Sequence, residues 1–171
     1  MMRAGVSEAA PLRLGLLILA VLSALATLTE LAMERHWTPG TQLVPWVTLG
    51  LVAIMSLAVL LRPGRKLIRG VQVIGLLVLL SAVFGVWEHV ESNFESGELD
   101  QRYSATWDTL PVQTRWWLAM THEVGPSPPL APAASAYAAL TMLLATVRHP
   151  AAAQRGPLFS GGKNGKDSFS A

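Results

Sequence analysis

The chain has 171 residues, of which 51% are hydrophobic and 14% are charged, and its net charge is +2. Soluble domains carry about 25% charged residues, so this balance is typical of a membrane protein. The chain contains no Cys, which excludes a disulfide framework, thiol redox chemistry and thiolate metal sites within it. The sequence also lacks a basic run with interleaved aromatic residues, the pattern that would indicate a nucleic-acid partner.

Four uncharged apolar blocks predict four transmembrane helices. An α-helix rises about 1.5 Å per residue, so blocks of 16 to 19 residues reach roughly 24–29 Å, close to the hydrocarbon core of about 30 Å. Lipid offers no partner to backbone amides, so each block is expected to be helical. The predicted fold class is all-α, a polytopic membrane protein whose four-transmembrane-helix bundle occupies residues 1–150, with spans near 12–33, 43–61, 70–90 and 130–148.

The first block has one competing interpretation, a cleaved signal peptide. Basic residues precede the block, and Ala24-Leu25-Ala26 has the small-x-small form of a signal-peptidase site. The apolar run continues past this triplet to Met33, which favours a retained span. Near its end lie Glu30 and Glu34, four residues apart and therefore on one helix face, and His36 follows them.

The connection between the second and third blocks decides the orientation. The segment RPGRKLIR carries Arg62, Arg65, Lys66 and Arg69, and short loops rich in Lys and Arg remain in the cytoplasm. Both termini are then expected to be cytoplasmic as well. The connections after the first and third blocks are expected to face the outer compartment.

The third block ends in a group of ionisable residues, in the stretch WEHVESNFE. Glu88, His89 and Glu91 follow the last apolar residues, on the same side of the membrane as the end of the first block. Carboxylates and imidazoles are ligands for divalent metals, and ionisable groups at membrane depth often mark function. Two interpretations stay open: a solvated helix end, or a divalent-metal or proton-relay site formed by Glu30, Glu34, His36, Glu88, His89 and Glu91.

The long outer loop, 91–129, is expected to contain a short helix lying on the outer leaflet. The segment TWDTLPVQTRWWLAM is rich in Trp, which favours the membrane–water boundary. Thr106 or Asp108 is expected to cap this helix, with Pro111 in its first turn. The Pro-rich segment after it is expected to be extended.

The fourth block begins with small residues that permit close helix approach, which predicts a helix–helix seam. After it, residues 151–171 are rich in Gly, Ser and Lys and are predicted to form a flexible cytoplasmic tail.

Two segments together, WEHVESNFE and SPPLAPAASAYAALTMLLATVRHP, carry a resemblance. The chain resembles small, uncharacterised four-span bacterial membrane proteins in which an acidic-His exit precedes a Pro-rich entry and a small-residue helix. The resemblance implies a four-span fold in the bacterial inner membrane and no particular activity.

Two classes of function follow from these observations. The first is an accessory or structural subunit that packs in the lipid bilayer against a larger membrane complex, or against a second copy, through the fourth span. The second is a protein that binds a divalent metal ion or relays protons at the outer Glu/His cluster. No catalytic constellation is evident, because no His is placed to activate the Ser residues of the spans.

Overall fold

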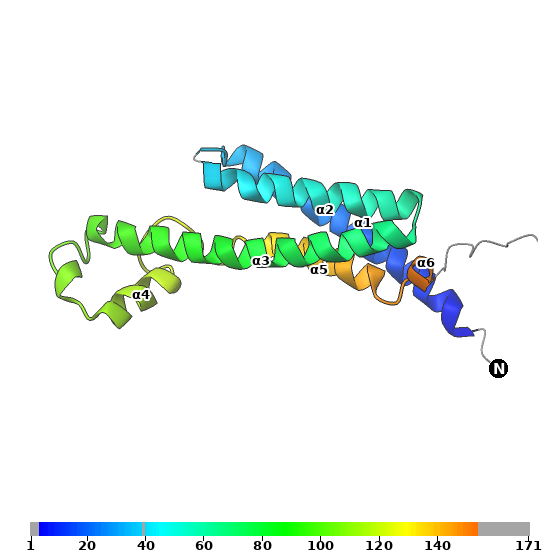
Figure 1. Cartoon of the computed structure of the whole chain (residues 1–171). Coiled ribbons are helices and arrows are strands. Elements are labelled where there is room, and N and C mark those ends of the chain that lie inside the picture. Colours follow the sequence, from blue (N-terminus) through cyan, green and yellow to red (C-terminus); the bar gives the residue numbers. More distant parts are fainter. Residues whose placement is uncertain (1–3, 39, 154–171) are drawn as a thin grey trace, which may run out of the picture.

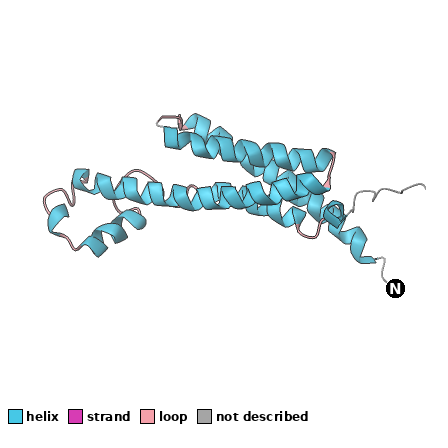
Figure 2. Cartoon of the chain, viewed as in Figure 1, coloured by secondary structure: helices cyan, strands magenta, loops and turns pink. Residues whose placement is uncertain are grey.

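The computed structural model describes residues 4–38 and 40–153. Over these residues the chain forms helices joined by turns and loops, and no strand (Figure 2). The all-α prediction is confirmed. The four longer helices of the bundle are α1 (Ala4–Met33), α2 (Leu43–Leu61), α3 (Arg65–Ser96) and α5 (Ala133–Thr146).

Three of these helices, α1, α2 and α3, are long and apolar enough to cross a membrane. The bounds of α2, Leu43–Leu61, coincide with the predicted second span. Helix α5 differs from the prediction, because it has 14 residues instead of spanning 130–148. Its length of roughly 21 Å is below the hydrocarbon thickness of about 30 Å. Helix α5 begins only after the Pro-rich segment, at Ala133. It ends before Arg148, whose φ of 48° is not helical.

The four helices form a bundle in which successive helices run in opposite directions (Figure 1). Helix α1 packs against α2 and α5, and α3 packs against the same two helices. A short turn through Pro63 and Gly64 joins α2 to α3. The core of the bundle is apolar, with Leu49, Val52 and Ile68 fully buried.

Small side chains allow α5 to approach its neighbours closely. Ala138, Ala139 and Ala145 have no exposed surface. On the facing helix, a Cβ added to Gly75 of α3 would lie 2.6 Å from Cγ of Leu143, so a larger residue at position 75 would require the Leu143 side chain to move. The small-residue face of α5 is therefore occupied by helices of its own chain.

Helix α3 is longer than the predicted span 70–90 and continues to Ser96. Its 32 residues reach roughly 48 Å, which exceeds the bilayer core by about 18 Å. No Pro or Gly interrupts the segment after Trp87 until Gly97, so the helix continues through the Glu/His stretch. Its C-terminal end projects beyond the bundle and carries a separate small cap (Figure 1).

The cap is a folded unit with its own core, where the sequence predicted a loop containing one helix. It consists of the end of α3, two short 3-10 helices, η2 (Gly97–Leu99) and η3 (Trp107–Thr109), and α4 (Val112–Met120). Trp107 is 2% exposed, and the Phe94 ring stacks on Trp116 with centroids 4.4 Å apart. The predicted short helix is present as α4; it begins after Pro111 without a side-chain cap, so capping by Thr106 or Asp108 was wrong.

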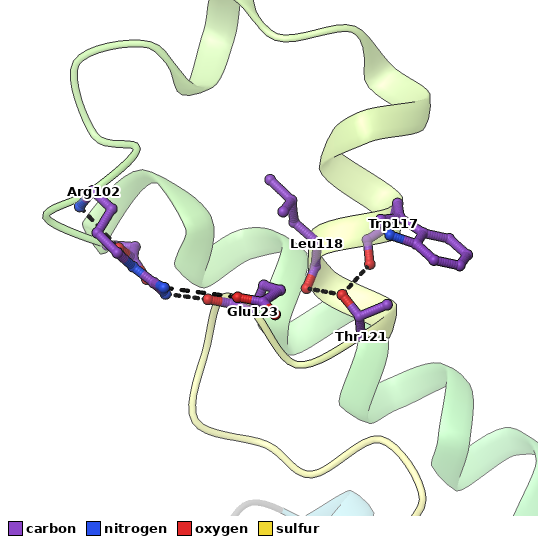
Figure 3. A network of polar contacts seen from close by, with 6 residues as sticks. Arg102, Trp117, Leu118, Thr121 and Glu123 are labelled. Carbon is purple, nitrogen blue, oxygen red and sulfur yellow. Dashed lines mark hydrogen bonds and ion pairs between the residues drawn. The ribbon is translucent and has the colours of Figure 1, made fainter.

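Within the cap, polar contacts join the segment after η2 to the segment after α4 (Figure 3). The Arg102 guanidinium pairs with the Asp100 carboxylate at 2.9 Å, and it also donates to the backbone carbonyl of Glu123. The hydrogen bond from Arg102 holds the pKa of Asp100 below its ordinary value. At the end of α4, the Thr121 hydroxyl donates to the Trp117 carbonyl at 2.8 Å.

The opposite end of the bundle is held by contacts between distant segments. Arg13 of α1 donates to the carbonyl of Arg148, 3.2 Å away, just beyond α5. The chain then forms the short helix α6 (Pro150–Ala153), which packs against α3 and buries Ala151. These residues belong to the segment predicted as a tail, and the remainder of that segment, 154–171, lies outside the described residues.

Candidate ligand-binding cavity

A cavity of about 690 Å³ lies at the end of the bundle that is nearer the cap. Its walls come from the last turns of α1, the start of α2, the middle and C-terminal part of α3, and the segment that leads into α5. Five of the six predicted site residues line it: Glu30, Glu34, His36, Glu88 and His89. The sixth, Glu91, does not line the cavity, because it lies on another side of α3.

The α3 wall follows from helical spacing. Ser81, Gly85, Glu88 and Ser92 line the cavity at intervals of four, three and four residues, which place them on one helix face. His89 lies at the edge of this face and also lines the cavity. Glu91, three residues beyond Glu88, is not among the residues that line the cavity.

The wall formed by α1 depends on how that helix ends. Arg35 adopts a left-handed conformation with a φ of 54°, and the amide of His36 donates to the Leu31 carbonyl at 2.9 Å. This pairing across the last turn is the usual way in which a left-handed residue terminates a helix. The His36 carbonyl then accepts a hydrogen bond of 2.6 Å from the Trp46 indole, so His36 is held between α1 and α2.

Asn93 is fully buried, and it positions the cavity wall formed by the Pro-rich segment before α5. Its amide donates to the carbonyls of Ala119, 3.2 Å away, and Ser127, 2.7 Å away, and its oxygen accepts from the Ser127 amide at 2.9 Å. The next residue, Pro128, has its carbonyl 2.7 Å from Nδ1 of His89. One buried side chain thus joins α3, α4 and the Pro-rich segment beside the cavity.

The electrostatics of the cavity are dominated by its carboxylates. Within residues 4–38 and 40–153, Glu30, Glu34 and Glu88 make no ion pair. Partial burial lowers the pKa of His36 below its ordinary value of 6.5; the neighbouring His89 acts in the same direction, and Glu34 opposes both. The side chains that line the cavity therefore carry a net negative charge when the imidazoles are neutral.

The divalent-metal site stays a prediction. In the described part of the chain, no three His, Asp or Glu side chains are grouped closely enough to hold one metal ion. Glu30, Glu88 and His89 line the same cavity, but no hydrogen bond joins them. Metal ligands must lie within about 2.0–2.6 Å of a shared ion, whereas these residues surround a much larger space.

Several lining residues were not anticipated from the sequence. Ser135 is only 5% exposed and lines the cavity together with Thr27, Gln42 and Phe84. The sequence placed Ser135 among the small packing residues of the fourth block. Spacing along one helix contains no signal for such a residue, because its exposure to the cavity depends on where the neighbouring helices end.

The arrangement provides acidic, hydroxyl and apolar groups around one space, which is the chemistry of a binding site for a small molecule. Comparison with known protein families, curated proteins and solved structures shows no match to this chain.

Proposed function

We propose that the protein is an integral inner-membrane protein with four membrane helices, and that its outer cavity binds a small ligand. The observation that carries the proposal is the cavity of about 690 Å³ lined by Glu30, Glu34, His36, Glu88 and His89. Ligand sites of proteins have volumes of about 300–1,000 Å³, with a few polar groups set among apolar walls. Five of the six ionisable residues that the sequence singles out line this one cavity.

The orientation is supported by charge. The exposed residues Arg62, Arg65, Lys66 and Arg69 lie at the α2–α3 end of the bundle, which the positive-inside rule assigns to the cytoplasm. The cavity lies at the opposite end, so it opens toward the outer compartment. Both termini are on the cytoplasmic side in this arrangement.

The short α5 is compatible with a fourth membrane crossing. Irregular backbone is tolerated at membrane depth where it lines a cavity or is buried in protein, and the segment before α5 lines the cavity. It contains Pro126, Pro128, Pro129 and Pro132, which have no N–H donor to leave unsatisfied. The amide of Ser127 donates to Asn93.

A matched pair of Trp substitutions tests the binding function. Ala131 lines the cavity, whereas Ala133, two residues further on, is exposed and does not line it. Thermal unfolding of the purified protein in detergent is measured with three probes of equal chain length: hexylammonium, hexanol and hexanoate. At least one probe is expected to raise the Tm of the wild type and of Ala133→Trp, but not that of Ala131→Trp. If no probe raises the Tm, or if Ala131→Trp responds fully, the proposal fails.

The second candidate function is that of an accessory subunit. The small-residue face of α5 is occupied within the chain, so the fourth helix no longer supports this function. The cap does: Trp117 is 61% exposed, Met120 is 53% exposed and Leu99 is 83% exposed, and aromatic and Met side chains are enriched in protein interfaces. A partner would be a larger membrane complex or a second copy.

The mass of the protein in mildly solubilised native membranes tests the accessory function. A subunit docked through the cap is expected to migrate as a larger complex, which the double variant Trp117→Ser and Met120→Ser should lose. Thr109→Ser, at an exposed position elsewhere in the cap, serves as the control. Migration of the wild type as a single chain would exclude this function.

A further inference from the structure

The walls of the cavity carry charge of one sign. Three carboxylates, Glu30, Glu34 and Glu88, line it, and no Lys or Arg is among the described residues that do so. At the edge of a membrane these charges are costly unless they are solvated or paired. An anionic ligand would be repelled, and a neutral one would leave the negative charge of the carboxylates uncompensated. A cationic group is the chemistry that complements these walls.

The hydroxyl of a mostly buried residue also faces this space. Ser135 is 5% exposed and lines the cavity, and its hydroxyl forms no hydrogen bond with the described residues. The Ser135 hydroxyl is therefore available to accept a hydrogen bond from a donor inside the cavity.

His89 provides a second acceptor. Its Nδ1 lies 2.7 Å from the Pro128 carbonyl, and a carbonyl oxygen only accepts, so Nδ1 carries the proton in the neutral ring. The Nε2 atom of neutral His89 then has a free lone pair. Carboxylates, a free hydroxyl and an imidazole lone pair together suit a ligand with several N–H donors.

The remainder of the wall is apolar, and the space is far larger than an ion. Leu31, Val44, Phe84 and Leu130 line the cavity, and the aromatic ring of Phe84 is able to pack against either an alkyl group or a cation. A bare metal ion would leave these side chains without contact. The ligand is expected to join a positive group to an apolar body.

We infer that the cavity binds an organic cation, an ammonium group attached to a small apolar body. The inference rests on the proposed function and specifies its ligand class. The ammonium lies toward Glu30, Glu88 and His89, and the apolar body lies against Phe84 and Leu130.

The probe for this inference is hexylammonium, compared with hexanol and hexanoate by titration calorimetry. Hexylammonium is expected to bind most tightly and hexanoate not to bind. The double variant Glu30→Gln and Glu88→Gln should weaken the Kd of hexylammonium at least tenfold. Glu98→Gln serves as the matched control, because Glu98 is exposed on η2 and does not line the cavity.

The outcomes of these titrations distinguish a failure of the cation inference from a failure of the proposed binding function. If hexanol or hexanoate binds at the site blocked by Ala131→Trp while hexylammonium does not, the ligand class is wrong and the binding function stands. If none of the three binds, both fail. If Zn²⁺ alone binds and the double variant abolishes it, the cavity is a metal site and the inference is overturned. Should the double variant not fold, Glu34→Gln, just beyond the end of α1, tests the contribution of the acidic wall, and a weaker Kd of hexylammonium is expected.

Ammonium groups reach such a cavity either as free amines or as lipid headgroups. Titration of hexylammonium in nanodiscs distinguishes these sources. An equal Kd with phosphatidylglycerol alone and with added phosphatidylethanolamine indicates a free amine, whereas a Kd weakened by phosphatidylethanolamine indicates competition by the headgroup. Both results support an ammonium ligand, and absence of binding in both nanodiscs contradicts it.

Discussion

Asn93 is the residue on which the cavity wall and the cap both depend. Its side chain is fully buried and makes hydrogen bonds to the backbone of Ala119 and Ser127. Gly125 lies directly against it, with a φ of 79°, and a Cβ at this position would be 2.5 Å from Cα of Asn93. The chain after α4 therefore turns where only glycine fits, and Asn93 satisfies the backbone groups that this turn buries.

Asn93→Ala is expected to lower the free energy of unfolding by about 3 kcal/mol, because buried backbone groups left without partners cost about 1–3 kcal/mol each. The measurement is denaturant unfolding in detergent, followed by the fluorescence of the cap tryptophans. Ser104→Ala, at an exposed position of the cap, should change it little. Equal stability of both variants would show that water replaces the Asn93 contacts.

The pH dependence of stability should reflect His36, whose pKa is lowered in the folded state by partial burial and by His89, against the opposing effect of Glu34. The unfolded chain then binds more protons than the folded one at pH values below the ordinary His pKa of about 6.5. The stabilisation is complete above that value and is lost as the pH falls below it. The cavity groups around this imidazole are Glu30, Glu34, Glu88 and His89.

The Tm is accordingly expected to fall between pH 7.5 and pH 5.5, and His36→Gln should reduce this fall. Part of it should persist, because burial and the nearby Arg13 also lower the pKa of His149. His122→Asn is the control, since His122 is exposed outside the cavity and Asn tolerates its positive φ. An unchanged pH profile in His36→Gln would contradict the assignment.

At the scale of elements, α5 is the shortest helix of the bundle and is packed against all three of the others. Its two faces differ: Ala138 has no exposed surface, whereas Leu144 is 50% exposed. Small residues let helix backbones approach closely within membranes, where apolar burial alone does not drive association. The buried small residues let α5 pack closely against its three neighbours.

Ala138→Leu is therefore expected to destabilise the bundle by about 2 kcal/mol, the usual cost of inserting methylene groups into a packed core. Leu144→Ala should change stability much less, because Leu144 lies on the outer surface. Thermal melting and size-exclusion chromatography in detergent measure both effects. If the two variants melt together, the Ala138 face is not the packing seam.

At the scale of the whole molecule, the proposed orientation has a direct test. A reporter fused after Lys166 is expected to be cytoplasmic, and one inserted between Ser104 and Ala105 should be in the outer compartment, because four basic residues lie at the α2–α3 end of the bundle, in the turn and the first turns of α3. Ser104 and Ala105 are exposed in the cap, so the insertion leaves its core intact. The opposite result at both sites would reverse the topology.

The sequence by itself determined the helical elements of the membrane part. Uncharged blocks of 16 to 19 residues and the need to satisfy every backbone amide in lipid leave helices as the only choice, and the bounds of α2 agree to the residue. The same reasoning brings the ends of α1 and α3, with Glu30 and Glu88, to one end of the bundle. These features follow from local composition and chain direction, which need no tertiary contact.

Only the tertiary structure decided the rest. The length of α5, the folded cap and the cavity depend on contacts between distant segments, such as Asn93 with Ser127 and Gly75 with Leu143. The distance between ionisable groups on different helices is set by how closely those helices pack, and sequence spacing contains no measure of it. Glu30, Glu88 and His89 were therefore predictable as neighbours at one end of the bundle, whereas their placement around one open cavity followed only from the packing of the bundle.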